Sequence, residues 1–430
     1  NCWCGCPGLR RGAVGAGRRQ RQAAVDELAE VFADPLFQNA GVGREDLHEL
    51  ATGNPVLADA VAALYRAYRD LGDAAEAAQG AYAIDGVVTS ALDRDGQPPV
   101  EEVRDFIQSK GNYFAELDGA AERLHSELDL GDGDLYAALS GRLEDLHGLR
   151  VQVMPVDVMA STLRRFDRHG RRILLSEVLD QPARNFQLAF QLGLFEQDAA
   201  IDAAVAASQL SRAEARRLGR ITLANYFAAA LLMPYARFHT AAEELAYDIE
   251  MLSRRFGASF EQVCHRLTTM QRPDAQGVPF FLIRVDVAGN ISKRFSGGVF
   301  PFSKSGGACP RWNVHDVFRV PGRIQTQIIQ LPDNSTYFSI ARTVRRPGGA
   351  YGEPDQELAV GLGCDIRHAD RFIYASGVDL ADPGAVVHIG INCRLCERPD
   401  CAQRAHPPLH RKLVLDETRR TATPFSFAFD

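Results

Sequence analysis

Three cysteines near the end of the chain have the residue type and the spacing of a metal site. Cys393, Cys396 and Cys401 are separated by two and by four residues. Two residues between thiols let both sulfur atoms of a tight turn face one ion, and a third thiol closes one side of the site. The spacing therefore predicts an iron–sulfur cluster or zinc. Three thiols without a metal are the alternative, although their concentration in one short segment favours a metal.

The two kinds of centre differ in the ligands that they require. A four-iron cluster can be held by three protein thiolates, whereas tetrahedral zinc needs a fourth ligand. Other cysteines and histidines supply candidates for that ligand: Cys309, Cys364, His388 and His406. Three arginines would either offset the negative charge of a thiolate-bound centre or form an exposed basic turn: Arg394, Arg398 and Arg404.

The distribution of the nine cysteines also bears on the compartment. Their number is odd, and none lies between Cys6 and Cys264. A secreted domain held by disulfides would show an even number at regular spacings. We therefore predict a protein of the reducing cytoplasm with a local metal or redox site.

Residues 184–194 resemble the zinc-binding helix of a metallopeptidase but lack its ligands. That helix normally reads His-Glu-x-x-His, which places two imidazoles on zinc and a glutamate as general base. Here these three positions hold Phe190, Gln191 and Leu194. A later helix would supply an acidic third ligand, yet residues 219–230 contain no acid. There is also no Gly-x-Ser-x-Gly motif of a serine esterase. We therefore predict a protein that is not an enzyme.

The composition and net charge of the chain limit the classes of protein to which it can belong. A chain of 430 residues with 46% hydrophobic and 24% charged residues can form two or three soluble domains. Its formal net charge of -7 gives it no overall attraction to nucleic acid, so a local patch or a partner must supply positive charge for DNA binding. No apolar run is long enough to span a bilayer, and we predict no membrane association.

Hydrophobic periodicity divides the chain into four parts. Residues 1–22 are rich in Gly, Arg and Cys and are interpreted as disordered or as a misread start. Residues 23–148 have helical spacing and form a linker or dimerisation region. Residues 149–272 form the degenerate metallopeptidase-like domain, and residues 273–430 form a mixed α/β sensor-like domain with the cysteine cluster. The fold class is therefore α+β.

Local signals predict the main elements. Helices are expected over 182–196, 201–209, 212–237 and 241–255, with Gly257 as a left-handed cap. Strands are expected over 149–155, 172–175, 280–286, 358–364 and 371–374. Residues 323–331 and 336–344 should form a hairpin around the turn at Asn334.

Several long segments together resemble one family, the short-chain fatty acyl transcriptional regulators of actinobacteria and their relatives. The resemblance runs from about residue 24 to the end. Its most specific segments are 113–118, 224–235, 259–267, 289–294, 309–314 and the cysteine cluster with residues 403–405. It implies regulation of fatty acid, propionate or glyoxylate metabolism genes in response to short-chain acyl-CoA. It also implies a four-iron cluster in preference to zinc.

The resemblance further implies partners. In the family an N-terminal helix-turn-helix binds promoter DNA, whereas residues 1–22 are too short for such a domain and lack its apolar spacing. A homodimer is expected because such regulators bind two-fold DNA sites.

The acyl-CoA site should combine cations for the phosphates with an apolar surface for the acyl chain. The expected ligand-binding residues are Arg184, Tyr235, Lys293, Arg294 and Arg311. The apolar side chains of the former zinc helix would form the wall of the acyl pocket. Alternatively, Arg184 only caps a helix or pairs with a carboxylate, and Tyr235 belongs to the core. Two other functions compete with acyl-CoA sensing: an iron–sulfur or zinc redox sensor without a CoA ligand, and a residual metallopeptidase.

Overall fold

A computed structural model of the chain describes residues 28, 31–32, 43–65, 98–128, 134–303, 307–346, 348, 352, 354–409, 411–423 and 425–427. The chain forms two compact units, Asn1–Glu102 and Val103–Asp430. The segment 1–22, interpreted above as disordered or misread, lies outside the described residues. Among the described residues, no helix is both long and apolar enough to cross a membrane.

The described residues of the first unit include two short consecutive helices. Helix α2 (Arg44–Gly53) begins where the Gly43 N–H donates to the Asp46 carboxylate at 2.7 Å. A second helix covers residues 55–65. Leu28, Leu47, Ala51 and Ala58 form a small core.

Helix α4 (Pro99–Ser109) spans the boundary between the units, and α5 (Ala115–Glu127) and α6 (Leu135–His147) follow it in the second unit. Helix α6 begins where Asp134 accepts a hydrogen bond from the Tyr136 N–H at 2.9 Å. It ends at Gly148, whose φ of 61° is a conformation that glycine adopts without strain. The helical character predicted for this stretch is thus present in its described residues.

A small sheet and a group of helices follow. The sheet has the order β1-β3-β2, from β1 (Arg150–Met154), β2 (Arg164–Asp167) and β3 (Arg172–Ser176), with β1 parallel and β2 antiparallel to β3. The helices are α7 (Val156–Met159), α8 (Gln181–Glu196), α9 (Asp198–Ala206), α10 (Ala213–Leu232), α11 (Tyr235–Glu244), α12 (Ile249–Phe256) and α13 (Phe260–Leu267). Gly257 ends α12 with φ 58°, as predicted.

Two of the predicted long helices are interrupted. The prediction of one helix over 212–237 was wrong because Pro234, which has no N–H to donate, separates α10 from α11. The prediction of one helix over 241–255 was wrong because Ala246 and Tyr247 adopt positive φ values of 47° and 59°. Both breaks turn the chain back onto the same core.

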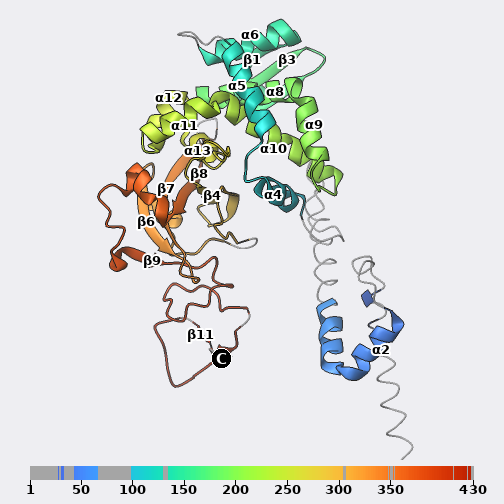
Figure 1. Ribbon diagram of the computed structural model, residues 1–430, viewed down its shortest axis with the longest axis vertical. Helices are drawn as coiled ribbons and strands as arrows, with labels where there is room; N and C mark the ends of the chain where they lie inside the picture. The colour runs from blue at the N-terminus through green and yellow to red at the C-terminus, as the bar shows by residue number, and fades with distance from the viewer. Residues whose placement is uncertain are drawn as a thin grey trace, which may run out of the picture. The chain divides into compact units, whose positions relative to one another are not determined.

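The second sheet has six strands in the order β5-β4-β8-β7-β6-β9. Its strands are β4 (Phe281–Asp286), β5 (Ile291–Ser296), β6 (Gln325–Gln330), β7 (Thr336–Arg346), β8 (Gln356–Asp365) and β9 (Val386–His388). Figure 1 shows β4, β7 and β8 on the side of the unit that carries α11, α12 and α13. The predicted hairpin is present as β6 and β7, and Asn334 has a positive φ of 66°.

Side chains alternate between the two faces of this sheet. Leu282, Phe338 and Leu362 belong to the core shared with the helices. Phe281, Tyr337 and Trp312 belong to a second aromatic core on the opposite face. Both faces are therefore buried, which agrees with the nearly continuous runs of buried residues in β4, β7 and β8.

The remaining elements are short. They are α14 (Asn313–Asp316), η2 (Val317–Arg319), η3 (Ile366–Arg371), η4 (Ile373–Ala375), η5 (Pro383–Ala385), β10 (Leu413–Val414) and β11 (Ser426–Phe427). The prediction of a strand over 371–374 was wrong. The Ile373 N–H donates to the Ala246 carbonyl at 2.8 Å, and Phe372 is buried in the core, so this segment folds as 3-10 turns.

Candidate functional sites

In the former zinc helix, an arginine lies against the positions that hold a zinc ligand and the general base in a metallopeptidase. Phe190 and Gln191 are buried on α8. The guanidinium carbon of Arg164, from β2, lies 4.2 Å from the centroid of the Phe190 ring, and Arg164 also donates a hydrogen bond to the Gln191 side chain. Burial lowers the pKa of Arg164 to about 10, so it remains a cation at neutral pH. A fixed positive charge here is unfavourable for a divalent metal ion.

The cysteine cluster lines a small cavity together with a fourth cysteine. The side chains around it include Cys309, Cys393, Cys396 and Cys401. His388 lines the same cavity, whereas Cys364 lies on β8 in the shared core. Burial raises the pKa of the Cys309 thiol, and the neighbouring Cys393 and Cys396 raise it further.

The donor types fit a thiolate-bound centre, although the donors are not already arranged as ligands. Within the described part of the chain, no three His, Cys, Asp or Glu side chains form a group that could hold a metal ion. A Cβ at Gly390 would lie 2.7 Å from Cys396 Sγ, so only glycine lets this thiol approach so closely. The cavity lining contains three arginines and no carboxylate: Arg311, Arg398 and Arg404. A lining of thiols and cations without acids fits an anionic metal–thiolate centre. To bind one, the segment that carries the three cysteines would have to bring their sulfur atoms closer together.

A second group of cations surrounds the first turn of α13. Glu261 accepts from Arg284 Nη1 at 2.6 Å, from Lys293 Nζ at 2.8 Å and from Arg346 Nη2 at 2.9 Å. Arg284 and Lys293 are cross-strand partners of β4 and β5. Although burial raises the pKa of Glu261, the three cations lower it to about 2. One carboxylate thus faces three cations, and burial lowers the pKa of Lys293.

Arg184 lies near the same turn of α13. The Gln262 amide donates to the Pro182 carbonyl at 3.4 Å, which joins the first turns of α13 and α8. Arg184 Nη2 donates to the Glu177 carbonyl at 3.1 Å. Its Nε is buried and has no hydrogen-bond partner in the described part of the chain. This leaves one donor of a predicted ligand-binding arginine available.

Tyr235 occupies a different environment. It is fully buried, its hydroxyl donates to the Ala275 carbonyl at 2.9 Å, and it accepts from the Arg272 N–H at 2.8 Å. The Arg272 guanidinium carbon lies 4.0 Å from the centroid of the Tyr235 ring. Burial raises the pKa of Tyr235 to about 12. These contacts give Tyr235 a structural role beside any contact with a ligand.

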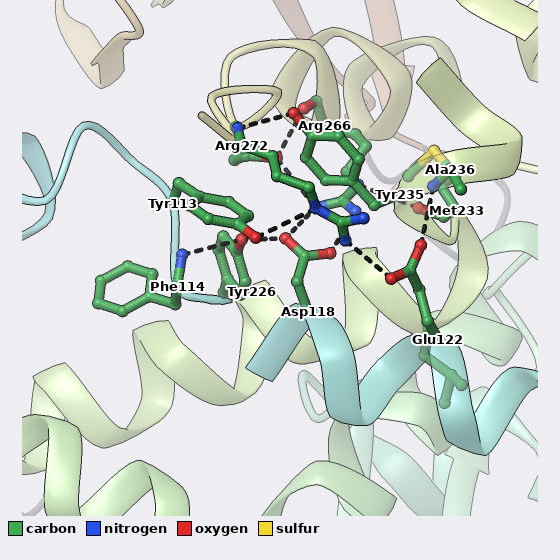
Figure 2. A network of polar contacts seen from close by, with 12 residues as sticks. Tyr113, Phe114, Asp118, Glu122, Tyr226, Met233, Tyr235, Ala236, Arg266 and Arg272 are labelled. Carbon is green, nitrogen blue, oxygen red and sulfur yellow. Dashed lines mark hydrogen bonds and ion pairs between the residues drawn. The ribbon is translucent and has the colours of Figure 1, made fainter. Parts of the chain in front are cut away.

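Figure 2 shows the polar network next to Tyr235. Arg266 and Asp118 are completely buried, and Arg266 Nη2 lies 2.6 Å from Asp118 Oδ1. Tyr226 donates to the same carboxylate. Arg266 Nε donates to the Met233 carbonyl at 3.0 Å, at the break between α10 and α11. Glu122, one turn along α5, pairs with Arg272 at 2.7 Å. The network therefore joins α5, α10 and α13.

The five predicted acyl-CoA residues are thus distributed over several environments. Lys293 pairs with Glu261 in the first turn of α13, and Arg184 lies in the first turn of α8, which the bond from Gln262 to Pro182 joins to α13. Arg294 follows Lys293 on β5 and donates to the Ser303 carbonyl. Arg311 lines the cysteine cavity. Tyr235 is a core residue with hydrogen bonds of its own.

The sequence did not single out Glu261, Arg284, Arg346 or Arg164. Their partners are more than twenty residues away in the chain, and in each case strand pairing or helix packing brings them together. No local signal could have identified them.

Comparison with known proteins places these sites in a family. Residues 269–425 match the family model described as short-chain fatty acyl coenzyme A regulator, C-terminal, and residues 144–268 match the IrrE N-terminal-like domain of the M78 peptidases. A solved chain described as a Mycobacterium tuberculosis transcriptional regulator superposes with a TM-score of 0.72 at 45% identity. The match covers 76% of this chain and 99% of that chain.

Curated relatives match over nearly the whole chain. The HTH-type transcriptional regulator RamB of Mycobacterium tuberculosis is 42% identical over 403 residues, which cover 93% of this chain and 84% of RamB. The HTH-type transcriptional regulator PrpR of the same species is 41% identical, over 94% of this chain and 82% of PrpR. The propionyl-CoA carboxylase regulator of Cereibacter sphaeroides is 40% identical, over 94% of this chain and 84% of that protein.

The chain therefore belongs to the short-chain fatty acyl coenzyme A regulator family. It is a transcriptional regulator of the RamB and PrpR type that carries a peptidase-like domain.

Proposed function

We propose that this regulator responds to a short-chain acyl-CoA, whose phosphates bind the cations around the first turn of α13. The observation that carries the proposal is the charge imbalance there, where Arg284, Lys293 and Arg346 share the single carboxylate of Glu261. Cations that crowd one another are stabilised by a further anion. Arg184, in the first turn of the neighbouring α8, adds a buried Nε–H that has no partner among the described residues.

Calorimetric titration with propionyl-CoA and acetyl-CoA tests this proposal. The variants Arg184→Ala and Lys293→Ala should each weaken binding at least tenfold, because each removes a charged donor to phosphate. Arg217→Ala, on an exposed face of α10, should leave the affinity unchanged. Tyr235→Phe removes the hydroxyl that bonds to the Ala275 carbonyl and the Arg272 N–H, and it keeps the ring. Measuring its stability and its affinity for acyl-CoA separates the structural role of this hydroxyl from a role in binding. A wild-type chain that ignores acyl-CoA would contradict the proposal.

We further propose that the cysteine cavity holds an iron–sulfur cluster, with zinc as the alternative. Cys393, Cys396 and Cys401 would be ligands, and Cys309, which lines the same cavity, is the best placed fourth thiol. Such a group would supply redox chemistry in the cluster case and structural rigidity in the zinc case.

Anaerobic purification and visible absorption test this second proposal. A brown chain that contains iron and sulfide, and loses both in the triple serine variant of Cys393, Cys396 and Cys401, supports the cluster. Cys309→Ser should reduce the metal content, whereas Cys364→Ser should not, because Cys364 lies on β8 outside the cavity. A colourless chain with one zinc selects the alternative, and a metal-free chain contradicts both. A brown chain indifferent to CoA would be a redox sensor.

We also propose that this regulator binds promoter DNA through a helix-turn-helix and that it forms a homodimer. The names of RamB and PrpR support the first. Light scattering of the purified chain tests the second.

A further inference from the structure

Arg404 is a buried arginine among the thiols of the cysteine cavity. Only 3% of its surface is exposed, and it lines the cavity beside Cys393, Cys396 and Cys401. Its two terminal nitrogens donate to four backbone carbonyls of its own segment. Nη1 reaches Cys393 at 3.1 Å and His406 at 3.3 Å, and Nη2 reaches Cys396 at 3.0 Å and Arg398 at 2.6 Å. One guanidinium thus holds the carbonyls of two of the three clustered cysteines.

The charge of Arg404 is not balanced by an acidic side chain in the described part of the chain. Among the described residues no carboxylate pairs with it, in contrast to the nearby Arg411, which pairs with Glu397 at 3.0 Å. The Phe427 ring, 4.9 Å from its guanidinium carbon, supplies only a weak cation–π contact. A buried charge without an opposite charge is unfavourable, so an anion is the missing partner.

A specific donor of Arg404 is also unsatisfied. Its Nε is buried and has no hydrogen-bond partner among the residues that the structure describes, whereas each terminal nitrogen has two. Buried N–H groups are nearly always paired, so an unpaired one in a cavity indicates an absent acceptor. Thiolate sulfur and cluster sulfide are acceptors that carry negative charge.

We propose that Arg404 is the counter-ion and positioning residue of the thiolate-bound centre, with its Nε–H donating to a sulfur atom. This inference rests on the proposed iron–sulfur cluster. The backbone contacts fix the loop, and the positive charge offsets the negative charge of the metal–thiolate group. Because reduction adds a negative charge, a buried cation beside the cluster favours the reduced state and raises the reduction potential.

The full chain, reconstituted anaerobically with ferrous iron and sulfide, provides the test. In Arg404→Gln the ratio of reduced to oxidised cluster at a fixed potential should fall about tenfold, which corresponds to about 59 mV for a one-electron couple. Arg404→Lys keeps the charge and should lie between this variant and the wild type. Arg419→Gln removes an exposed arginine outside the cysteine loop and should leave the potential unchanged. An unchanged potential in Arg404→Gln overturns the proposal.

If the Arg404→Gln variant binds too little iron for its potential to be measured, thermal unfolding with and without the cluster provides a second test. If Arg404 only holds the loop through its backbone hydrogen bonds, Arg404→Gln lowers the melting temperature equally in the metal-free and the loaded chain. That result overturns the proposal. If it is the counter-ion, the gain in melting temperature on loading is smaller in Arg404→Gln than in the wild type. A wild-type chain that retains no iron or sulfide overturns the cluster itself, whereas iron retention with unaltered properties of the variant overturns only the role of Arg404.

Discussion

At the scale of single residues, the buried pair of Arg266 and Asp118 connects α5 to the helices of the peptidase-like domain. Every polar atom that the pair presents is used, since Tyr226, Thr269 and the Met233 carbonyl complete its hydrogen bonds. A pair of this kind offsets the cost of burying two charges only while both partners are present.

Asp118→Asn should therefore destabilise the chain by about 3–5 kcal/mol, because it leaves the Arg266 cation buried without its counter-charge. Urea unfolding of the full chain measures the change. Glu116→Gln, an exposed residue of the same helix, is the control and should change the free energy of unfolding by less than about 0.5 kcal/mol. A loss below about 1 kcal/mol in Asp118→Asn would show that the pair contributes little.

His265 gives the stability a defined dependence on pH. Its ring centroid lies 4.5 Å from that of Phe295, edge to face, and burial, assisted by Lys293, lowers its pKa to about 3. The unfolded chain binds this proton below pH 6.5 and the folded chain does not, so the contribution to stability is complete above pH 6.5 and decreases as the pH falls toward 3.

We expect His265→Phe to remove roughly 2 kcal/mol of the loss in stability between about pH 6.5 and pH 4, a discounted value because the ring keeps some contact with water. Denaturant unfolding of both chains at several pH values measures the two slopes. Equal slopes would show that His265 already titrates normally in the folded chain.

At the scale of elements, glycines let the central strand β8 pack between its neighbours. A Cβ at Gly363 would lie 2.4 Å from the Phe281 ring and 2.7 Å from the Phe338 carbonyl oxygen. The backbone of β7 cannot move aside without breaking the ladder between β7 and β8. A side chain at this position therefore separates the strands.

Gly363→Ala should cost about 1–3 kcal/mol through overpacking. Gly141→Ala is the matched control, because Gly141 lies inside α6 and a methyl group added there would have nothing within 4 Å. That control should stabilise the chain by about 0.5–1 kcal/mol, since alanine loses less backbone entropy in a helix. Thermal unfolding compares the two, and a Gly363→Ala variant as stable as the wild type would contradict the packing argument.

At the scale of the whole molecule, the two domains recognised by family comparison share one core. Tyr247, from the peptidase-like part, packs on Phe280 with ring centroids 5.3 Å apart, and Phe280 packs on Phe372 at 5.0 Å. Phe372 continues to Phe338 of the sheet at 6.0 Å. Residues 103–430 accordingly form one compact unit.

Phe372→Ala should lower the stability of both domains together, by about 3–5 kcal/mol. Calorimetry should show a single transition for residues 103–430 in the wild type, and the variant should shift that transition as a whole. Two transitions, of which only one moves, would show that the domains unfold independently.

The sequence by itself determined the class of this protein and several of its elements. Local backbone geometry sets the helix end at Gly257, the helix start at Pro182 and the turn at Asn334. The sequence alone therefore predicts where they occur. The loss of the metallopeptidase ligands at Phe190, Gln191 and Leu194 is likewise a matter of residue type. Of the two long helices predicted wrongly, one is interrupted at Pro234, which is a local signal, and the other at Tyr247, whose positive φ no local signal predicts.

Only the tertiary structure decided which side chains meet. Cys309 reaches the cavity of the clustered cysteines from more than eighty residues away, and Glu261 gathers cations from three strands. The sequence left Arg404 open between an exposed basic turn and a partner of the thiols, and the fold buries it. Local patterns record the backbone preferences of neighbouring residues, whereas sites depend on contacts between distant segments, which packing and strand register set.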